Sequence, residues 1–167
     1  MLGLTSLGVF HTGISLVAVG AGFIALARFG AISSRTSAGA VFLWGTVISC
    51  LTALGIFRHG GFGVPHVFAI LELVVLAVAL GADRLQAFGR LSPYVATTGF
   101  SFALFLHFIP ATVETLTRLP LGAPYLSGPE DPKAQPILGL FFLAFLIGVT
   151  LQVIRLRRMP QGVARTA

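Results

Sequence analysis

Apolar residues fill five long segments of this chain, and polar residues gather between them. The segments cover residues 10–27, 38–57, 65–81, 94–114 and 136–154. Each is close to the roughly 20 residues that an α-helix needs to cross about 30 Å of hydrocarbon. None shows the alternation of a membrane β-strand, and a helix satisfies its backbone within one segment. The pattern predicts an all-α integral membrane bundle with five transmembrane helices, forming a single transmembrane domain over residues 1–167.

Polar residues and prolines indicate where these helices end. The first and third segments are short, and polar ends would extend them. We expect Asp83 and Arg84 to end the third segment, and Pro65 suits the first turn of a helix. The longest connection, 119–135, contains four prolines and is expected to be a stiff outer loop. Three interpretations stay open for this loop: a plain surface loop, a lid, or a surface that binds a partner.

The basic residues indicate how the chain is oriented. If the C-terminus is cytoplasmic, eight basic residues lie inside and three outside, as the positive-inside rule requires. The inner set is Arg28, Arg35, Arg84, Arg90, Arg155, Arg157, Arg158 and Arg165, and the outer set is Arg58, Arg118 and Lys133. We therefore predict that the N-terminus lies outside. Because no Lys or Arg precedes Arg28, the first segment is interpreted as a retained span rather than a cleaved signal peptide.

Composition agrees with a lipid environment. Charged residues make up 10% of the chain, against about 25% in soluble domains, and the mean hydropathy is +0.95. The net charge of +6 lies beside apolar segments and forms no basic face, so the lipid bilayer, and not nucleic acid, is the expected partner. Cys50, the only cysteine, cannot form a disulfide within the chain and is interpreted as a small packing residue.

Small residues at four-residue spacing predict close helix contacts. Ala18 and Gly22 recur in the first segment, and Gly45, Ser49 and Ala53 recur in the second. This spacing lets two helix backbones approach each other. It fits packing within the chain as well as a homo-oligomer or a larger complex.

Two ionisable residues fall deep in the predicted spans. Glu72 and His107 both lie roughly 10 Å below the outer surface, at a rise of about 1.5 Å per residue. A bare carboxylate in hydrocarbon costs at least about 2.5–3.5 kcal/mol. Glu72 is therefore expected to face protein, where it is protonated, pairs with a cation or binds a metal.

The other candidates lie nearer the outer surface. His107, Glu114 and Arg118 share one helical stripe at the end of the fourth segment, where Pro110 is expected to kink the helix. His11, His59 and His66 are expected around the mouth of the same region, where each would otherwise be an ordinary interfacial histidine. Arg118 and Arg58 are candidates for binding an anion.

Three functions fit this set of residues. A transition metal or a b-type haem would use the histidines and Glu72, for redox chemistry or metal handling. A small proton-coupled transporter or channel subunit would use Glu72 and His107 as a relay. A non-catalytic accessory subunit of a larger membrane complex needs neither a metal or haem site nor a proton relay. An enzyme acting on a lipid is weaker, because no nucleophile motif accompanies the acid–base pair.

The first part of the chain resembles a known family. His11, Gly20, Gly22 and Arg28 are followed by Gly39-Ala40-Val41-Phe42, and this order is similar to small bacterial predicted membrane proteins of unknown function. The resemblance covers about residues 1–60 and implies a bacterial inner-membrane, multi-pass protein. Ser33, Ser34 and Arg35 stand where that family is expected to have a second histidine, so a metal or haem role is not carried over from it.

Overall fold

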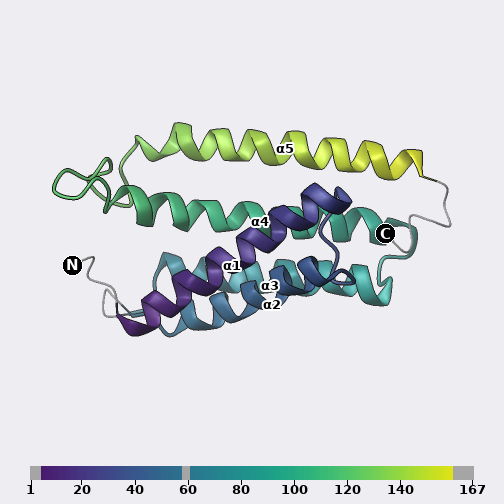
Figure 1. Cartoon of the computed structure of the whole chain (residues 1–167), viewed down its shortest axis with the longest axis horizontal. Coiled ribbons are helices and arrows are strands. Elements are labelled where there is room, and N and C mark those ends of the chain that lie inside the picture. The colour runs from purple at the N-terminus through teal and green to yellow at the C-terminus, as the bar shows by residue number, and fades with distance from the viewer. Residues whose placement is uncertain (1–4, 58–60, 160–167) are drawn as a thin grey trace.

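The protein is all-helical in the part of the chain that the computed structural model describes, residues 5–57 and 61–159, where no β-strand occurs. Five long helices follow one another in the chain, with one short 3-10 helix, η1, before the fourth (Figure 1). They are α1 (Ser6–Phe29), α2 (Ser37–Leu54), α3 (Val64–Leu85), η1 (Gly89–Leu91), α4 (Ser92–Leu116) and α5 (Ala134–Arg158). All five long helices are long and apolar enough to cross a membrane.

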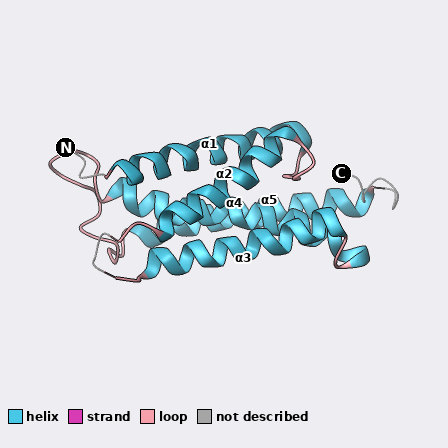
Figure 2. Ribbon diagram, turned by 90° about the horizontal axis from the view of Figure 1, so that it is seen from below, coloured by secondary structure: helices cyan, strands magenta, loops and turns pink. Residues whose placement is uncertain are grey.

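Successive helices run antiparallel, so the connections gather at the two ends of an elongated bundle (Figures 1 and 2). The α1–α2 turn, the α3–α4 connection and the end of α5 share one end, which we call the arginine-rich end. The α2–α3 turn and the long α4–α5 loop share the other, the loop end. Helix α1 packs mainly on α2 and α3 on α4, while α5 packs on α4.

The helix ends differ from the predicted spans in two informative places. Helix α2 ends at Leu54, three residues before the predicted limit of Phe57, because Gly55 caps it. Helix α3 continues through Asp83 and Arg84 to Leu85, so these residues do not end it as predicted. The prediction failed there because charged residues after an apolar run usually end a span, whereas the Asp83 carboxylate is buried against the α1–α2 turn.

Small residues set the closest helix contacts. A Cβ built on Gly45 would lie 3.0 Å from the Ala18 Cβ, and one built on Gly22 would lie 3.0 Å from the Phe42 ring. The hydroxyls of Ser49 and Ser15 meet at 2.6 Å. The small residues of α1 and α2 therefore pack within the chain. A second such contact, which the sequence spacing did not reveal, joins α3 and α4, where a Cβ on Gly99 would lie 2.9 Å from the Ala79 Cβ.

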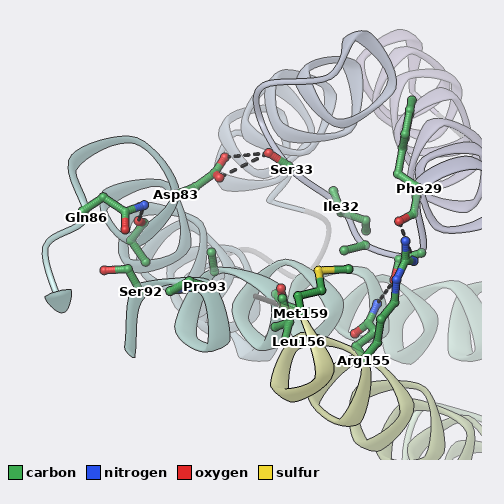
Figure 3. A pocket seen from close by; sticks show the side chains of 16 residues that line it. Phe29, Ile32, Ser33, Asp83, Gln86, Ser92, Pro93, Arg155, Leu156 and Met159 are labelled. Atoms are coloured by element: carbon green, nitrogen blue, oxygen red, sulfur yellow. Dashed lines mark hydrogen bonds between the residues drawn. The ribbon is translucent and has the colours of Figure 1, made fainter. Parts of the chain in front are cut away.

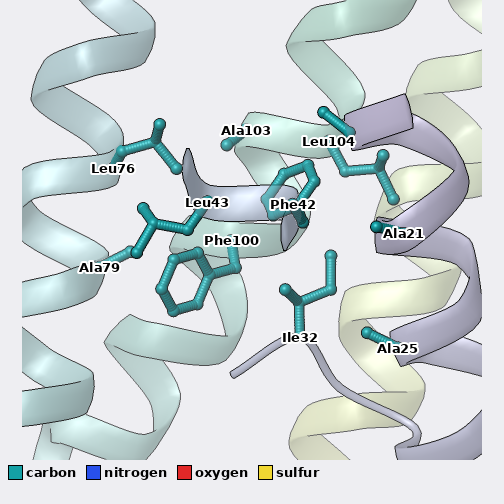
Figure 4. Close-up of a cluster of buried hydrophobic side chains, with 11 residues drawn as sticks. Ala21, Ala25, Ile32, Phe42, Leu43, Leu76, Ala79, Phe100, Ala103 and Leu104 are labelled. Atoms are coloured by element: carbon teal, nitrogen blue, oxygen red, sulfur yellow. The ribbon is translucent and has the colours of Figure 1, made fainter. Parts of the chain in front are cut away.

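Large apolar side chains pack around these small residues inside the bundle (Figure 4). Phe42 of α2 and Phe100 of α4 are fully buried, and Leu76 of α3 lies beside them. Ile32 reaches the same cluster from the α1–α2 turn. With Ala21 and Ala25 of α1, these residues form an entirely apolar layer, here called the apolar layer, that joins four of the five long helices.

Helix α5 stands at the edge of the bundle. The most apolar 18 residues of α5 include no buried residue. Its contacts with α4 are a set of stacked and tilted phenylalanine rings 4.7–5.7 Å apart and one hydrogen bond of 2.8 Å, from the Ser101 hydroxyl to Gln152 Oε1. The rings belong to Phe102, Phe105 and Phe108 of α4 and to Phe141, Phe142 and Phe145 of α5. Leucines and isoleucines elsewhere on α5 are exposed, which suggests a lipid environment.

The α4–α5 loop is ordered by one aspartate. The Asp131 carboxylate accepts hydrogen bonds from the backbone N–H groups of Ser127 at 2.9 Å and of Lys133 at 3.0 Å. These bonds, that of Ser127 first, favour the ionised form and hold the pKa of Asp131 below its ordinary value. Because Ser127, Asp131 and Lys133 all belong to the loop region, these hydrogen bonds fold the loop back on itself.

We predict that Gly99→Leu destabilises the bundle. The new side chain would collide with Ala79 of α3, and overpacking of this kind costs about 1–3 kcal/mol. The melting temperature of the purified protein in detergent should fall by several degrees. Gly148→Leu is the matched control, because its Cβ on α5 meets nothing within 4 Å, and equal melting temperatures for the two variants would contradict the close α3–α4 contact.

Candidate functional site

Two ionisable side chains meet inside the half of the bundle toward the loop end. Glu72 of α3 and His107 of α4 lie side by side, with 2.7 Å between Glu72 Oε1 and His107 Nδ1. Their side chains are 12% and 7% exposed, so both are largely removed from the surroundings of the bundle. The antiparallel contact of α3 with α4 places them at one level. The structure thus brings together the two residues that the sequence placed at equal depth.

The imidazole of His107 is held in a defined orientation. Its Nδ1 also lies 3.2 Å from the backbone carbonyl oxygen of Ala103, one turn earlier in α4. Because a carbonyl oxygen only accepts, this hydrogen bond requires the proton on Nδ1. The Glu72 Oε1 atom lies close to the same nitrogen but receives no well-aligned hydrogen bond. The remaining ring nitrogen, Nε2, is buried and has no hydrogen-bond partner among the described residues.

Helix α2 supplies two further polar groups to this region. The thiol of Cys50 donates to Glu72 Oε2 at 3.4 Å, so Cys50 is more than the packing residue that the sequence indicated. One turn away on the same face, the Thr46 hydroxyl is fully buried and has no partner in the described part of the chain. The four-residue spacing of Thr46 and Cys50 was a signal that the sequence interpretation missed.

His11 lies beside this group and joins α1 to α2. Its Nδ1 donates to the Ser49 carbonyl oxygen at 3.0 Å and lies 3.1 Å from the Thr52 hydroxyl. The Ser15 hydroxyl donates to the His11 carbonyl oxygen and meets Ser49. The charges of His107, Glu114 and Glu72 all reach the His11 ring, so His11 lies near the rim as well as near the buried pair. Its hydrogen bonds link helices α1 and α2.

His66 occupies a separate position at the start of α3. Its Nδ1 accepts the Gly63 backbone N–H at 3.1 Å, which caps the helix, and its ring lies 4.8 Å from that of Phe57 and 5.0 Å from that of Phe62. No contact joins it to Glu72 or His107 among the residues that the structure describes. Arg58 and His59, the other candidates in this turn, lie outside the described residues.

Glu114 and Arg118 form an ion pair across one turn at the end of α4. Glu114 is half-exposed and Arg118 is partly buried, so this pair faces the rim of the bundle. Pairs of this kind contribute little to stability. The residues of the predicted stripe therefore take part in two separate contacts. His107 belongs to the buried contact with Glu72, and Glu114 and Arg118 pair at the rim.

The described residues contain no group of three or more His, Cys, Asp or Glu side chains placed to hold a metal ion. The groups nearest to that chemistry are Glu72, His107 and Cys50. In this trio Nδ1 already donates to Ala103, and the thiol donates to the carboxylate. The arrangement is that of an acid–base cluster in which each member holds a proton or receives one.

A second polar cluster, which the sequence interpretation missed, lies at the arginine-rich end. The buried carboxylate of Asp83 accepts from the Ser34 hydroxyl at 2.6 Å and from the Ser34 backbone N–H at 2.8 Å. It also accepts from Ser33 at 3.2 Å and lies 3.6 Å from the Arg35 guanidinium. Arg84 bonds the Ser34 hydroxyl and carbonyl at 2.7 Å each. The cluster fastens the α1–α2 turn to the end of α3.

A cavity of about 60 Å³ lies beside this cluster (Figure 3). Asp83 borders it from α3 and Ser92 from α4, while Arg155 reaches across from α5 to the Phe29 carbonyl oxygen at 2.7 Å. Gln152 makes a similar bond to the Gly30 carbonyl oxygen at 3.2 Å. The space suits a few water molecules. Because its polar groups bond one another, this region holds helices α1, α3 and α5 together.

The comparisons with known proteins add no relative. The chain matches no family model, and searches of curated proteins and of solved structures found no match. The resemblance of the first segments to small bacterial membrane proteins therefore stays a prediction.

We predict that Asp83→Ala destabilises the fold without reaching the Glu72–His107 pair. The change removes the acceptor of the Ser33 and Ser34 hydrogen bonds, and bonds to a charged group contribute about 1.5–3 kcal/mol. The melting temperature should fall by several degrees. Glu130→Gln, a change at an exposed loop carboxylate, is the control; a melting temperature for Asp83→Ala equal to that of the control would show that the cluster does not fasten the turn.

Proposed function

We propose that this chain is a multi-pass membrane protein in which the Glu72–His107 pair binds and releases a proton, in the service of proton-coupled transport. The observation that carries the proposal is the 2.7 Å contact between two buried titratable groups on neighbouring helices that are apolar enough to span a bilayer. Ionisable groups inside membrane helices usually belong to ion or proton pathways. The bacterial inner membrane and the outward N-terminus remain part of this proposal.

Charge accounting favours a single exchangeable proton. An ionised carboxylate beside a neutral imidazole would leave one negative charge in an apolar bundle, at a cost of at least about 2.5–3.5 kcal/mol. One added proton neutralises the pair, whether it resides on Glu72 or makes His107 an imidazolium. A second would leave one positive charge. The pair therefore prefers to hold one added proton, which it gives up when the local environment becomes more polar.

The surroundings provide positions to which that proton can move. His107 Nε2 and the Thr46 hydroxyl are buried without partners in the described chain, so each has an open hydrogen-bonding position. His11 lies within electrostatic reach on the side of the loop end. Toward the other end, Leu76 and Ala79 of the apolar layer lie between Glu72 and Asp83 along α3. The arrangement fits a proton site that communicates with one side and is closed to the other.

We expect infrared difference spectra that follow uptake and release of this proton to contain a band from Glu72, which is a carboxylic C=O band if the proton resides on Glu72 and a shifted carboxylate band if it resides on His107. The band should disappear in Glu72→Gln and shift in frequency in His107→Asn, since the imidazole lies beside the carboxyl. Glu114→Gln, at the rim of the bundle, should leave the band unchanged. A spectrum in which Glu72→Gln removes nothing would refute a titrating pair.

A second candidate function, metal or haem b binding, is supported by the unpartnered Nε2 atom of His107. Imidazole ligands commonly use one nitrogen for the metal while the other donates to a carbonyl or carboxylate, as Nδ1 does here. The other ligands would come from beyond the described cluster, for example from a second copy of the chain.

Absorption spectra and metal analysis of the purified protein separate the two candidates. If His107 is a ligand, a Soret band or a bound metal should be lost in His107→Ala and kept in His66→Ala, because His66 lies apart from the pair. A sample that contains no metal and develops no Soret band after reconstitution with haem eliminates this candidate and leaves the proton proposal.

A further inference from the structure

An apolar groove runs along the surface between α1 and α2, in the half of the bundle toward the arginine-rich end. Its volume is about 380 Å³, and its lining is almost entirely apolar. Val17 and Ile24 form its α1 side, and Val41 forms its α2 side. The groove opens to the outside of the bundle, at a depth where acyl chains lie if these helices span a bilayer.

The floor of the groove is built from residues with small side chains. Gly20 and Ala21 of α1 and Ala38 of α2 line it. A Cβ built on Gly20 would meet nothing within 4 Å, so the space above this glycine is not taken by another helix of the chain. Gly22, on another face of α1, is by contrast in contact with Phe42 and Leu104. The groove is therefore an unfilled surface and not part of the internal packing.

A positively charged residue, Arg28, follows the lining residues of α1 at the arginine-rich end of the groove, which we call its mouth. Val17, Ala21, Ile24 and Arg28 follow one another at spacings of four, three and four residues, so the exposed Arg28 continues the stripe of α1 that lines the groove. Ser37, the first residue of α2, lies at the same end, and no acidic residue occupies the first turn of that helix. Asp83, the acid of this end, is buried and bonded to Ser33 and Ser34.

We propose that this groove binds one phospholipid with an anionic headgroup. An acyl chain would fill the space above Gly20, and the headgroup phosphate would pair with Arg28 and meet the Ser37 hydroxyl. Basic residues at the end of a membrane helix attract anionic lipids. An apolar helix from a second copy would fill the groove but would supply no anion to pair with Arg28. The charge of Arg28 therefore favours an anionic lipid. This proposal does not depend on the proton site.

The test uses two substitutions with matched controls. Gly20→Leu fills the groove from its open floor, and Gly13→Leu adds the same side chain to α1 at another position where a Cβ meets nothing within 4 Å. Arg28→Gln removes the cation at the mouth, and Arg157→Gln removes an exposed arginine in the last turn of α5. Each protein is placed in nanodiscs of equal parts phosphatidylglycerol and phosphatidylcholine. The lipids retained on release are identified by native mass spectrometry.

The wild type should retain one phosphatidylglycerol in several-fold excess over phosphatidylcholine. Gly20→Leu should lose the bound lipid, Arg28→Gln should lose the preference for phosphatidylglycerol, and both controls should behave as the wild type. Equal retention of the two lipids by the wild type, or equal losses in Gly20→Leu and Gly13→Leu, would overturn the proposal. A wild-type dimer that Gly20→Leu converts to a monomer would assign the groove to a second copy instead.

Discussion

The carboxyl group of Glu72 inside an apolar bundle constrains everything around it. Such a group is tolerated only if neighbouring groups neutralise its charge or form hydrogen bonds with it. Helices α4 and α2 each contribute one such group. His107 lies 2.7 Å from one carboxyl oxygen, and the Cys50 thiol donates to the other. The contacts of α2, α3 and α4 therefore have to place these three side chains within bonding distance.

Two features of the packing meet this requirement: a close contact of small residues between α3 and α4, and the polar cluster around Asp83 at the arginine-rich end. Gly99 and Ala79 let α3 and α4 approach two turns away from the pair, which fixes the height of Glu72 against that of His107. Asp83 fastens the end of α3 to the α1–α2 turn. Helix α5 adds a row of phenylalanine contacts to α4 and two bonds to the end of α1.

The sequence predicted the helices well because their apolar runs exceed what any other element needs. It also placed Glu72 and His107 at one depth, since helical rise converts residue number directly into height. It could not indicate that His66 would cap a helix, because that role depends on the turn before α3. It missed Asp83 because a carboxylate at the end of an apolar run is typical of solvent. Only the fold shows that Ser33 and Ser34 surround it.

The state of the His107 ring tests this account most directly. Solid-state ¹⁵N NMR of the protein in lipid, with labelled histidine assigned through His107→Asn, distinguishes the two ring nitrogens. The account predicts a protonated, hydrogen-bonded Nδ1 whose chemical shift changes in Glu72→Gln. A His107 ring protonated only on Nε2, with chemical shifts that are the same in the wild type and in Glu72→Gln, would contradict this account.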